Sequence, residues 1–259
     1  MTAEFSTAKY TPNPSVLIHG FGFSSTQWYP NVPALSPHFR LYAPDVPDQF
    51  GMSELCQVIQ TRENYALWLG DLLDNLGISK TALAGHSYGG WLATNFTLSQ
   101  PKRITHLALI APAGTFVPLS RQFFLRGIAG GALAGLLNLD FPVYSMVRWM
   151  TTLRPVEGLE IVEQFKVGMK NMAPVPAGMP GVFTSDKFAR LNLPVILLLG
   201  EREVIYSKRP QQVLDEGRRL LPGVQTVLIP NGGHAVTLDQ VEATNRALCD
   251  FFLSSHIGF

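Results

Sequence analysis

The chain has 259 residues, of which 46% are hydrophobic and 15% are charged, and its formal net charge is +1. This length and composition are typical of a folded protein with a large core, and they exclude an intrinsically disordered chain. The near-neutral charge, with no run of Lys and Arg, argues against a nucleic-acid partner.

Short apolar segments alternate with longer helical patterns along most of the chain. The expected strands are residues 15–20, 39–46, 80–86, 104–112, 194–201 and 225–231, and the expected helices are residues 61–77, 88–100, 208–223 and 237–255. This alternation predicts an α/β fold with a doubly wound, mostly parallel sheet. Only 14 residues precede the first expected strand, which leaves room for at most one further edge strand.

Residues 113–190 interrupt the alternation. Within them, residues 123–150 have a helical pattern and residues 172–181 have the composition of a loop. We therefore expect a core domain formed by residues 1–112 and 191–259, with residues 113–190 inserted as a helical cap, or lid, over the sheet.

No segment predicts a membrane anchor. The uncharged stretches 10–39 and 81–101 are broken by polar residues and 127–139 is short, so none reaches the ~20 apolar residues of a spanning helix. The N-terminal residues contain no apolar signal-peptide core. We therefore expect cytoplasmic residence and no stable membrane insertion.

The motif Gly-His-Ser-Tyr-Gly at residues 85–89 lies between an expected strand and an expected helix. In that context a G-x-S-x-G pattern predicts a tight turn that holds Ser87 in an unfavourable backbone conformation with its hydroxyl exposed. The following helix directs its positive end toward an anion that forms near Ser87. A glycine-rich turn can also be a connection without catalytic function. Whether Ser87 is a nucleophile therefore depends on residues elsewhere that could activate its hydroxyl.

A serine hydroxyl becomes a good nucleophile only beside a base, and the base needs a group that fixes its tautomer. His234 lies in a Gly-Gly loop after the last expected strand, and carboxylates follow the strand 194–201. The order Ser87, Glu203, His234 is the nucleophile–acid–base order of one particular fold.

Four motifs in register resemble those of the α/β-hydrolase superfamily, and in particular its capped, serine carboxylesterase-like members. They are HGFG (19–22), GHSYGG (85–90), PVILLLGERE (194–203) and PNGGH (230–234). The resemblance covers nearly the whole chain outside the cap, and it implies the α/β-hydrolase fold.

The resemblance also implies roles for single residues. Ser87 would be the nucleophile, His234 the general base and then acid, and Glu203 the orienting carboxylate. The backbone N–H groups of Phe21 and Tyr88 would form the oxyanion hole. His19 would be a structural residue of the HGFG loop.

Two positions depart from the family pattern. Glu203 stands where the family usually has Asp, and Glu201 is an alternative acid two residues earlier, although the motif position favours Glu203. In the segment 45–53, Asp48 replaces the first glycine of the usual D-x-x-G-x-G-x-S pattern and one residue is inserted. The local shape of that loop is therefore left open.

The remaining titratable residues suggest no cofactor and no metal. The sequence has no H-E-x-x-H, no His/Cys cluster and no G-x-G-x-x-G after a strand. Strand alternation points His86 away from Ser87. Two groups match no motif: the histidines His38, His106 and His256, and the cysteines Cys56 and Cys249, which are expected to be buried thiols.

The expected activity is a serine carboxylesterase that forms an acyl-enzyme on short- to medium-chain neutral esters. Apolar cap residues suggest a hydrophobic pocket: Phe123, Phe124, Leu125, Ile128, Leu133, Leu136, Leu137, Phe141, Tyr144, Met146 and Trp149. The alternatives are a lipase, a thioesterase, an amidase or a carbon–carbon bond hydrolase with the same triad, and a ligand-binding signalling protein on the same scaffold.

Overall fold

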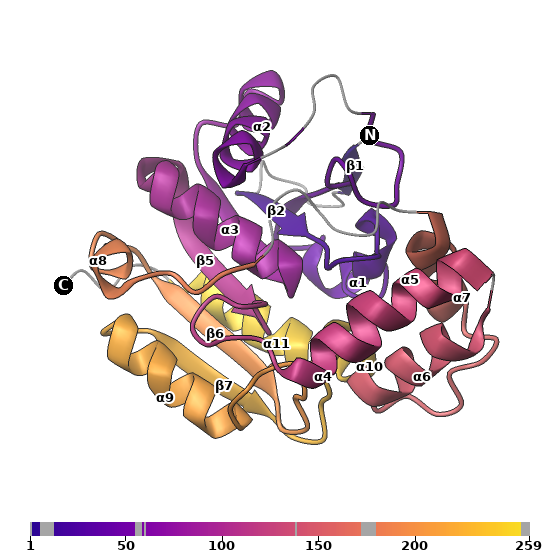
Figure 1. Cartoon of the computed structure of the whole chain (residues 1–259). Coiled ribbons are helices and arrows are strands. Elements are labelled where there is room, and N and C mark those ends of the chain that lie inside the picture. Colours follow the sequence, from indigo (N-terminus) through magenta and orange to yellow (C-terminus); the bar gives the residue numbers. More distant parts are fainter. Residues whose placement is uncertain are drawn as a thin grey trace.

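A computed structural model of the chain describes residues 2–5, 13–54, 59, 61–137, 139–171 and 180–254. In this part of the chain, seven strands form one sheet in the order β1-β3-β2-β4-β5-β6-β7 (Figure 1). Their bounds are β1 Thr2–Phe5, β2 Pro14–Ile18, β3 Arg40–Pro44, β4 Thr81–His86, β5 Ile104–Ile110, β6 Val195–Gly200 and β7 Gln225–Ile229.

Only β1 pairs antiparallel, with β3, and the other neighbouring strands are parallel. The predicted doubly wound, mostly parallel sheet is therefore confirmed. The segment before the first expected strand provides one further edge strand, β1, as its length allowed. Because the carboxyl ends of the parallel strands share one edge, the loops after β2, β4, β6 and β7 meet there.

Helices cover both faces of the sheet, as two separate hydrophobic clusters show. On one face lie α2 (Arg62–Asn75), α3 (Tyr88–Ser99) and α9 (Pro210–Leu220), which contribute Leu69, Trp91, Phe96 and Val213 to the first cluster. On the other face lie η1 (Ser25–Trp28), α1 (Val32–Leu35) and α11 (Val241–Leu253), which contribute Trp28, Leu35, Leu248 and Phe251 to the second.

The strands that are covered on both faces are largely apolar, as expected for a buried parallel sheet. Every residue of β4 and β6 is buried. A 3₁₀ turn, η2 (Pro101–Arg103), leads from α3 into β5, and a short helix, α8 (Ser185–Phe188), precedes β6.

The segment between β5 and β6 is helical. It contains α4 (Arg121–Phe123), a π-helical turn η3 (Phe124–Ala129), α5 (Gly130–Leu137), α6 (Phe141–Met150) and α7 (Glu160–Asn171). These elements pack on one another and gather on one side of the molecule, opposite α9 (Figure 1). The expected loop at 172–181 lies mostly outside the described residues.

The helical pattern at 123–150 forms several elements, and Asp140 and Pro142 mark the start of a new helix at α6. The expected helix 237–255 is wrong as a single element: it forms α10 (Val236–Asp239) and α11, with Gln240 at φ −135° and ψ 53° between them. None of the helices described combines the length and apolarity that a bilayer crossing requires.

Candidate active site

Ser87 sits at the junction of β4 and α3 in a backbone conformation that non-glycine residues rarely adopt, with φ 52° and ψ −115°. Its N–H donates to the carbonyl of Ile110 (2.9 Å), and its carbonyl accepts from the N–H groups of Gly90 (3.0 Å) and Ala113 (2.9 Å). These bonds hold the strained residue in place, which is how such conformations persist at functional sites.

The glycines of the motif provide clearance between backbones. A Cβ atom on Gly85 would lie 2.2 Å from the carbonyl oxygen of Gly89, and a Cβ on Gly89 would lie 2.2 Å from that of Ile18. Both contacts are with main chain and cannot be relieved by a side-chain movement. The turn that displays Ser87 therefore requires glycine at both positions.

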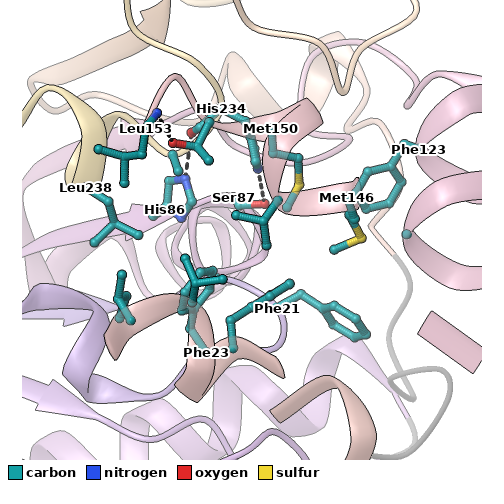
Figure 2. A pocket seen from close by; sticks show the side chains of 18 residues that line it. Phe21, Phe23, His86, Ser87, Phe123, Met146, Met150, Leu153, His234 and Leu238 are labelled. Carbon is teal, nitrogen blue, oxygen red and sulfur yellow. Dashed lines mark hydrogen bonds between the residues drawn. The ribbon is translucent and has the colours of Figure 1, made fainter. Parts of the chain in front are cut away.

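Ser87, His234 and Glu203 form one continuous hydrogen-bonded chain, and Figure 2 shows its link between Ser87 and His234. The Ser87 Oγ lies 2.9 Å from His234 Nε2, and His234 Nδ1 lies 2.9 Å from Glu203 Oε2. All three residues are buried. Because a carboxylate can only accept, His234 Nδ1 carries the proton toward Glu203 and Nε2 is left to accept from the serine hydroxyl.

Glu203 is held by its own neighbours, whereas Glu201 points elsewhere. The N–H groups of Val204 (2.7 Å) and Ile205 (3.0 Å) donate to Glu203 Oε1, which leaves Oε2 for the imidazole. Glu201 is exposed and accepts from the N–H of Asn231 at 2.9 Å. Of the two carboxylates weighed from the sequence, the structure brings Glu203 to His234.

The loop that carries His234 is fixed to the end of α6. The His234 N–H donates to the carbonyl of Met150 at 2.6 Å. Asp239 Oδ2 accepts from the N–H of Gly233 (3.1 Å) and of Thr152 (2.9 Å). Sequence reasoning missed Met150 and Asp239, because neither belongs to a motif that signals a contact between these two segments.

The HGFG loop brings Phe21 to the same edge of the sheet. The Phe23 N–H closes a turn onto the carbonyl of Gly20 at 3.2 Å. The N–H groups on either side of Phe21 are engaged by side chains: Gly20 by Gln27 (2.8 Å) and Gly22 by Gln49 (3.3 Å). Tyr88 is the first residue of α3, where backbone N–H groups point out of the helix end toward Ser87.

The divergent loop at 45–53 keeps its turn without the usual first glycine. Asp48 occupies that position with a positive φ of 69°, and its carboxylate accepts from the hydroxyl of Tyr65 at 2.6 Å. Asp is one of the residues that tolerates this conformation. His19 supports the start of the loop, because its Nε2 accepts from the N–H of Val46 at 2.9 Å. This contact fits the structural role expected for His19.

An apolar pocket opens beside Ser87 and His234 (Figure 2). The core contributes Phe21, Phe23 and Leu238, and the segment between β5 and β6 contributes Phe123, Gly127, Met146, Val147, Met150, Leu153, Ile161, Val162 and Phe165. Among the residues that the structure describes, no Asp, Glu, Lys or Arg lines it. The wall therefore favours an uncharged, hydrophobic ligand.

Of the apolar residues expected to form the lid whose side chains the structure describes, Phe123 and Met146 line this pocket. Others from that set are exposed instead: Phe124, Leu125, Leu133, Leu136, Leu137 and Phe141. Composition predicted an apolar segment but could not tell which of its faces turns inward, since almost every position in it is apolar.

His86 lines the same pocket as Ser87, but its two ring nitrogens face Gln27 Nε2 and the carbonyl oxygen of His234. Its Nε2 lies 2.9 Å from the carbonyl oxygen of His234, and its ring centroid is 5.0 Å from that of His234. Burial, and then the neighbouring His234, lower the pKa of His86 to about 3. The His86 ring therefore stays neutral under ordinary conditions.

The structure offers no alternative metal chemistry within its described residues, where no group of three or more His, Cys, Asp or Glu side chains is arranged to hold an ion. Cys249 is a free, partly exposed thiol whose pKa is raised by burial. Cys56 and His256 lie outside the described residues. His38 is exposed. His106 Nε2 lies 3.3 Å from the carbonyl oxygen of Ser254.

The sequence matches the profile of the alpha/beta hydrolase family over residues 16–247. It is 36% identical over 245 residues to the uncharacterised carboxylesterase nap of Bacillus subtilis (strain 168), covering 92% of this chain and 79% of that protein. It is 31% identical over 242 residues to carboxylesterase YbfK of the same organism, covering 91% and 79%. The crystal structure of naproxen esterase (carboxylesterase NP) from Bacillus subtilis superposes with a TM-score of 0.86 at 35% identity, covering 97% of this chain and 87% of that one.

Proposed function

The chain belongs to the alpha/beta hydrolase family and is a serine carboxylesterase, and we propose that Ser87, His234 and Glu203 are its catalytic triad. The observation that carries this proposal is the unbroken hydrogen-bonded chain from the strained serine through the imidazole to the carboxylate. Each member comes from a different loop at one edge of the sheet, as catalytic groups of this kind do.

In the acylation step, Ser87 Oγ attacks the carbonyl carbon of the ester while its proton passes to His234 Nε2. The carbonyl oxygen becomes an oxyanion, which the backbone N–H groups of Phe21 and Tyr88 stabilise by about 3 kcal/mol each. The intermediate collapses when the C–O bond to the alcohol breaks and His234 gives its proton to the leaving oxygen. The acyl group is then esterified to Ser87.

Deacylation repeats these transfers with water. His234 removes a proton from a water molecule, which attacks the acyl carbon, and the returned proton restores the Ser87 hydroxyl as the carboxylic acid leaves. Glu203 keeps Nδ1 of His234 protonated throughout, and its charge stabilises the imidazolium that forms in both steps. No cofactor or metal is needed for this sequence.

We propose that the substrates are neutral esters with short to medium hydrophobic chains. The pocket beside Ser87 offers apolar side chains on both sides, and none of its described lining residues is Asp, Glu, Lys or Arg. Residues 113–190 would act as the cap, since α6 and α7 provide much of the pocket wall that the core does not. An ester carrying a charge near the scissile bond would lose hydration there without gaining a partner.

Hydrolysis of p-nitrophenyl acetate, butyrate, octanoate and palmitate by the wild type and Ser87→Ala tests this function. We expect turnover of the shorter esters by the wild type, a decline toward palmitate, and none by the variant above the reagent blank. Equal turnover by Ser87→Ala would overturn the nucleophile. Activity confined to palmitate would favour a lipase, and activity confined to a thioester, an anilide or a diketone would favour the corresponding hydrolase. No turnover of any substrate would favour a ligand-binding protein.

A further inference from the structure

A buried glutamine, Gln27, contacts the HGFG loop, the end of β4 just before Ser87, and helix α10, which follows His234. Gln27 belongs to η1 and is 0% exposed. Its Oε1 accepts from the Gly20 N–H at 2.8 Å, and its Nε2 lies 2.8 Å from His86 Nδ1 and 3.1 Å from Thr237 Oγ1. Gln27 does not line the substrate pocket.

The backbone fixes the direction of these hydrogen bonds. The Gly20 N–H can only donate, so the atom that faces it is the Gln27 oxygen, and the Gln27 amide nitrogen must donate to His86 and Thr237. At the far side of the ring, the carbonyl of His234 can only accept, so His86 Nε2 carries the proton. The neutral tautomer of His86 therefore satisfies both of its neighbours at once.

Two contacts of Gln27, Gly20 and His86, are next to residues with a proposed catalytic role, and the third, Thr237, follows His234 in α10. Gly20 precedes Phe21 in the loop that would donate to the oxyanion. His86 precedes Ser87, and its other nitrogen bonds the backbone of His234. One side chain therefore fixes the separation between the Phe21 N–H and the imidazole, although these groups come from opposite ends of the chain.

On this geometry we propose that Gln27, acting through His86, is a positioning residue for ester hydrolysis. It holds the oxyanion loop and the His234 loop in the register that the transition state requires. The inference rests on the proposed function, since it assigns the role to the same site. Because Gln27 touches no substrate, its loss affects the turnover step and leaves substrate binding nearly unchanged.

The test compares Gln27→Met with a matched control. Methionine is similar in length and removes the amide, so the Gly20 N–H and His86 Nδ1 lose their partner. Asn31 is also fully buried and its Nδ2 bonds Asn245 Oδ1 at 2.8 Å, in the loop just after η1 and outside the site. The variant Asn31→Leu therefore removes a buried amide of the same segment without touching the catalytic loops.

We expect Gln27→Met to lower kcat about 10- to 100-fold with little change in KM, because small misplacements of reacting groups have effects of this size. Asn31→Leu should lower the melting temperature but keep kcat. Titration with a p-nitrophenyl phosphonate, which labels only competent serines, gives kcat per active site and removes any contribution from unfolded protein.

Wild-type kcat per site in Gln27→Met, or an equal loss in Asn31→Leu, would overturn the positioning role while leaving the proposed function intact. If Gln27→Met does not fold, Thr237→Val is tested in its place. Valine has nearly the shape of threonine but lacks the hydroxyl that accepts a hydrogen bond from the Gln27 amide. A lower kcat at unchanged KM supports the role, and wild-type kcat contradicts it. Absence of turnover in the wild type itself would instead overturn the esterase function and this role with it.

Discussion

At the scale of single residues, the site depends on how Glu203 is oriented. Two backbone N–H groups bind one of its oxygens and turn the other toward His234. Glutamate is one methylene longer than aspartate. Because the N–H groups of this loop bind Oε1, the longer side chain still directs Oε2 to His234. The glutamate therefore presents an oxygen to the imidazole from the position where the family usually has aspartate.

Glu203→Gln should lower kcat by about four orders of magnitude, because an amide in place of the carboxylate favours the wrong tautomer of His234. Glu201 is an exposed side chain two residues before Glu203, so Glu201→Gln should leave kcat close to that of the wild type. Steady-state kinetics on p-nitrophenyl butyrate compares the two. An equal loss in both variants, or a larger loss in Glu201→Gln, would contradict the assignment of the acid.

The residues that carry motifs were predictable from the sequence, and those that only support them were not. Ser87, Glu203 and His234 follow strands in a fixed order, so their meeting at one sheet edge could be inferred. Gln27 has no such signal, because a polar residue in a loop is ordinary. Its role depends on one backbone N–H and two side chains, from Gly20, His86 and Thr237, that only the folded chain brings together.

At the scale of elements, the strand-to-helix turns of the core are well defined by their sequence signals, and the cap is not. Helix α2 begins after Thr61, whose side chain accepts from the Asn64 N–H in a capping box, as the expected helix start required. The cap has few such signals between residues 123 and 137, where apolar, Gly and Ala residues leave the inward face unmarked. The inward position of Gly127 is visible only in the structure.

Gly127→Leu should narrow the pocket and lower kcat/KM for octanoate more than for acetate. A Cβ at Gly127 meets Met146 and Phe123 at 3.7 Å, so a larger side chain enters the pocket without a backbone clash. Gly130→Leu makes the same exchange one turn further along, at a position that does not line the pocket. The dependence of kcat/KM on acyl chain length, measured for both variants, tests this prediction. An unchanged octanoate-to-acetate ratio in Gly127→Leu would contradict this pocket as the acyl site.

At the scale of the whole molecule, folding brings loops from both ends of the chain to one sheet edge and buries neutral imidazoles there. The alternation of strands and helices was enough to predict the sheet and its parallel sense. The effect of the buried histidines on the free energy of unfolding could not be predicted from the sequence. Their environment arises only when the loops after β2, β4 and β7 pack against one another. Burial also lowers the pKa of His19.

These histidines make the free energy of unfolding depend on pH. His86 has a pKa of about 3 in the folded protein and 6.5 ordinarily, so the unfolded chain binds the extra proton between these values. Its contribution is complete above pH 6.5 and is lost as the pH falls toward 3, at about 1.4 kcal/mol for each pH unit.

Urea unfolding of the wild type and His86→Gln, from about pH 8 to about pH 4, isolates this contribution, because His19 and the carboxylates titrate in both proteins. We expect the wild type to be the more stable at the alkaline end and its advantage to shrink on acidification. A difference that stays constant across this range would show that His86 does not remain neutral by burial.

The central claim is that Ser87 carries the acyl group during turnover. Rapid acid quench of the protein with p-nitrophenyl butyrate, followed by mass spectrometry of the peptide that contains residues 85–90, measures this directly. We predict that the wild-type peptide gains the mass of one butyryl group on Ser87 during turnover, and that the Ser87→Ala peptide gains none. Steady turnover with an unmodified Ser87 peptide, or a butyryl group on another residue, would contradict the account.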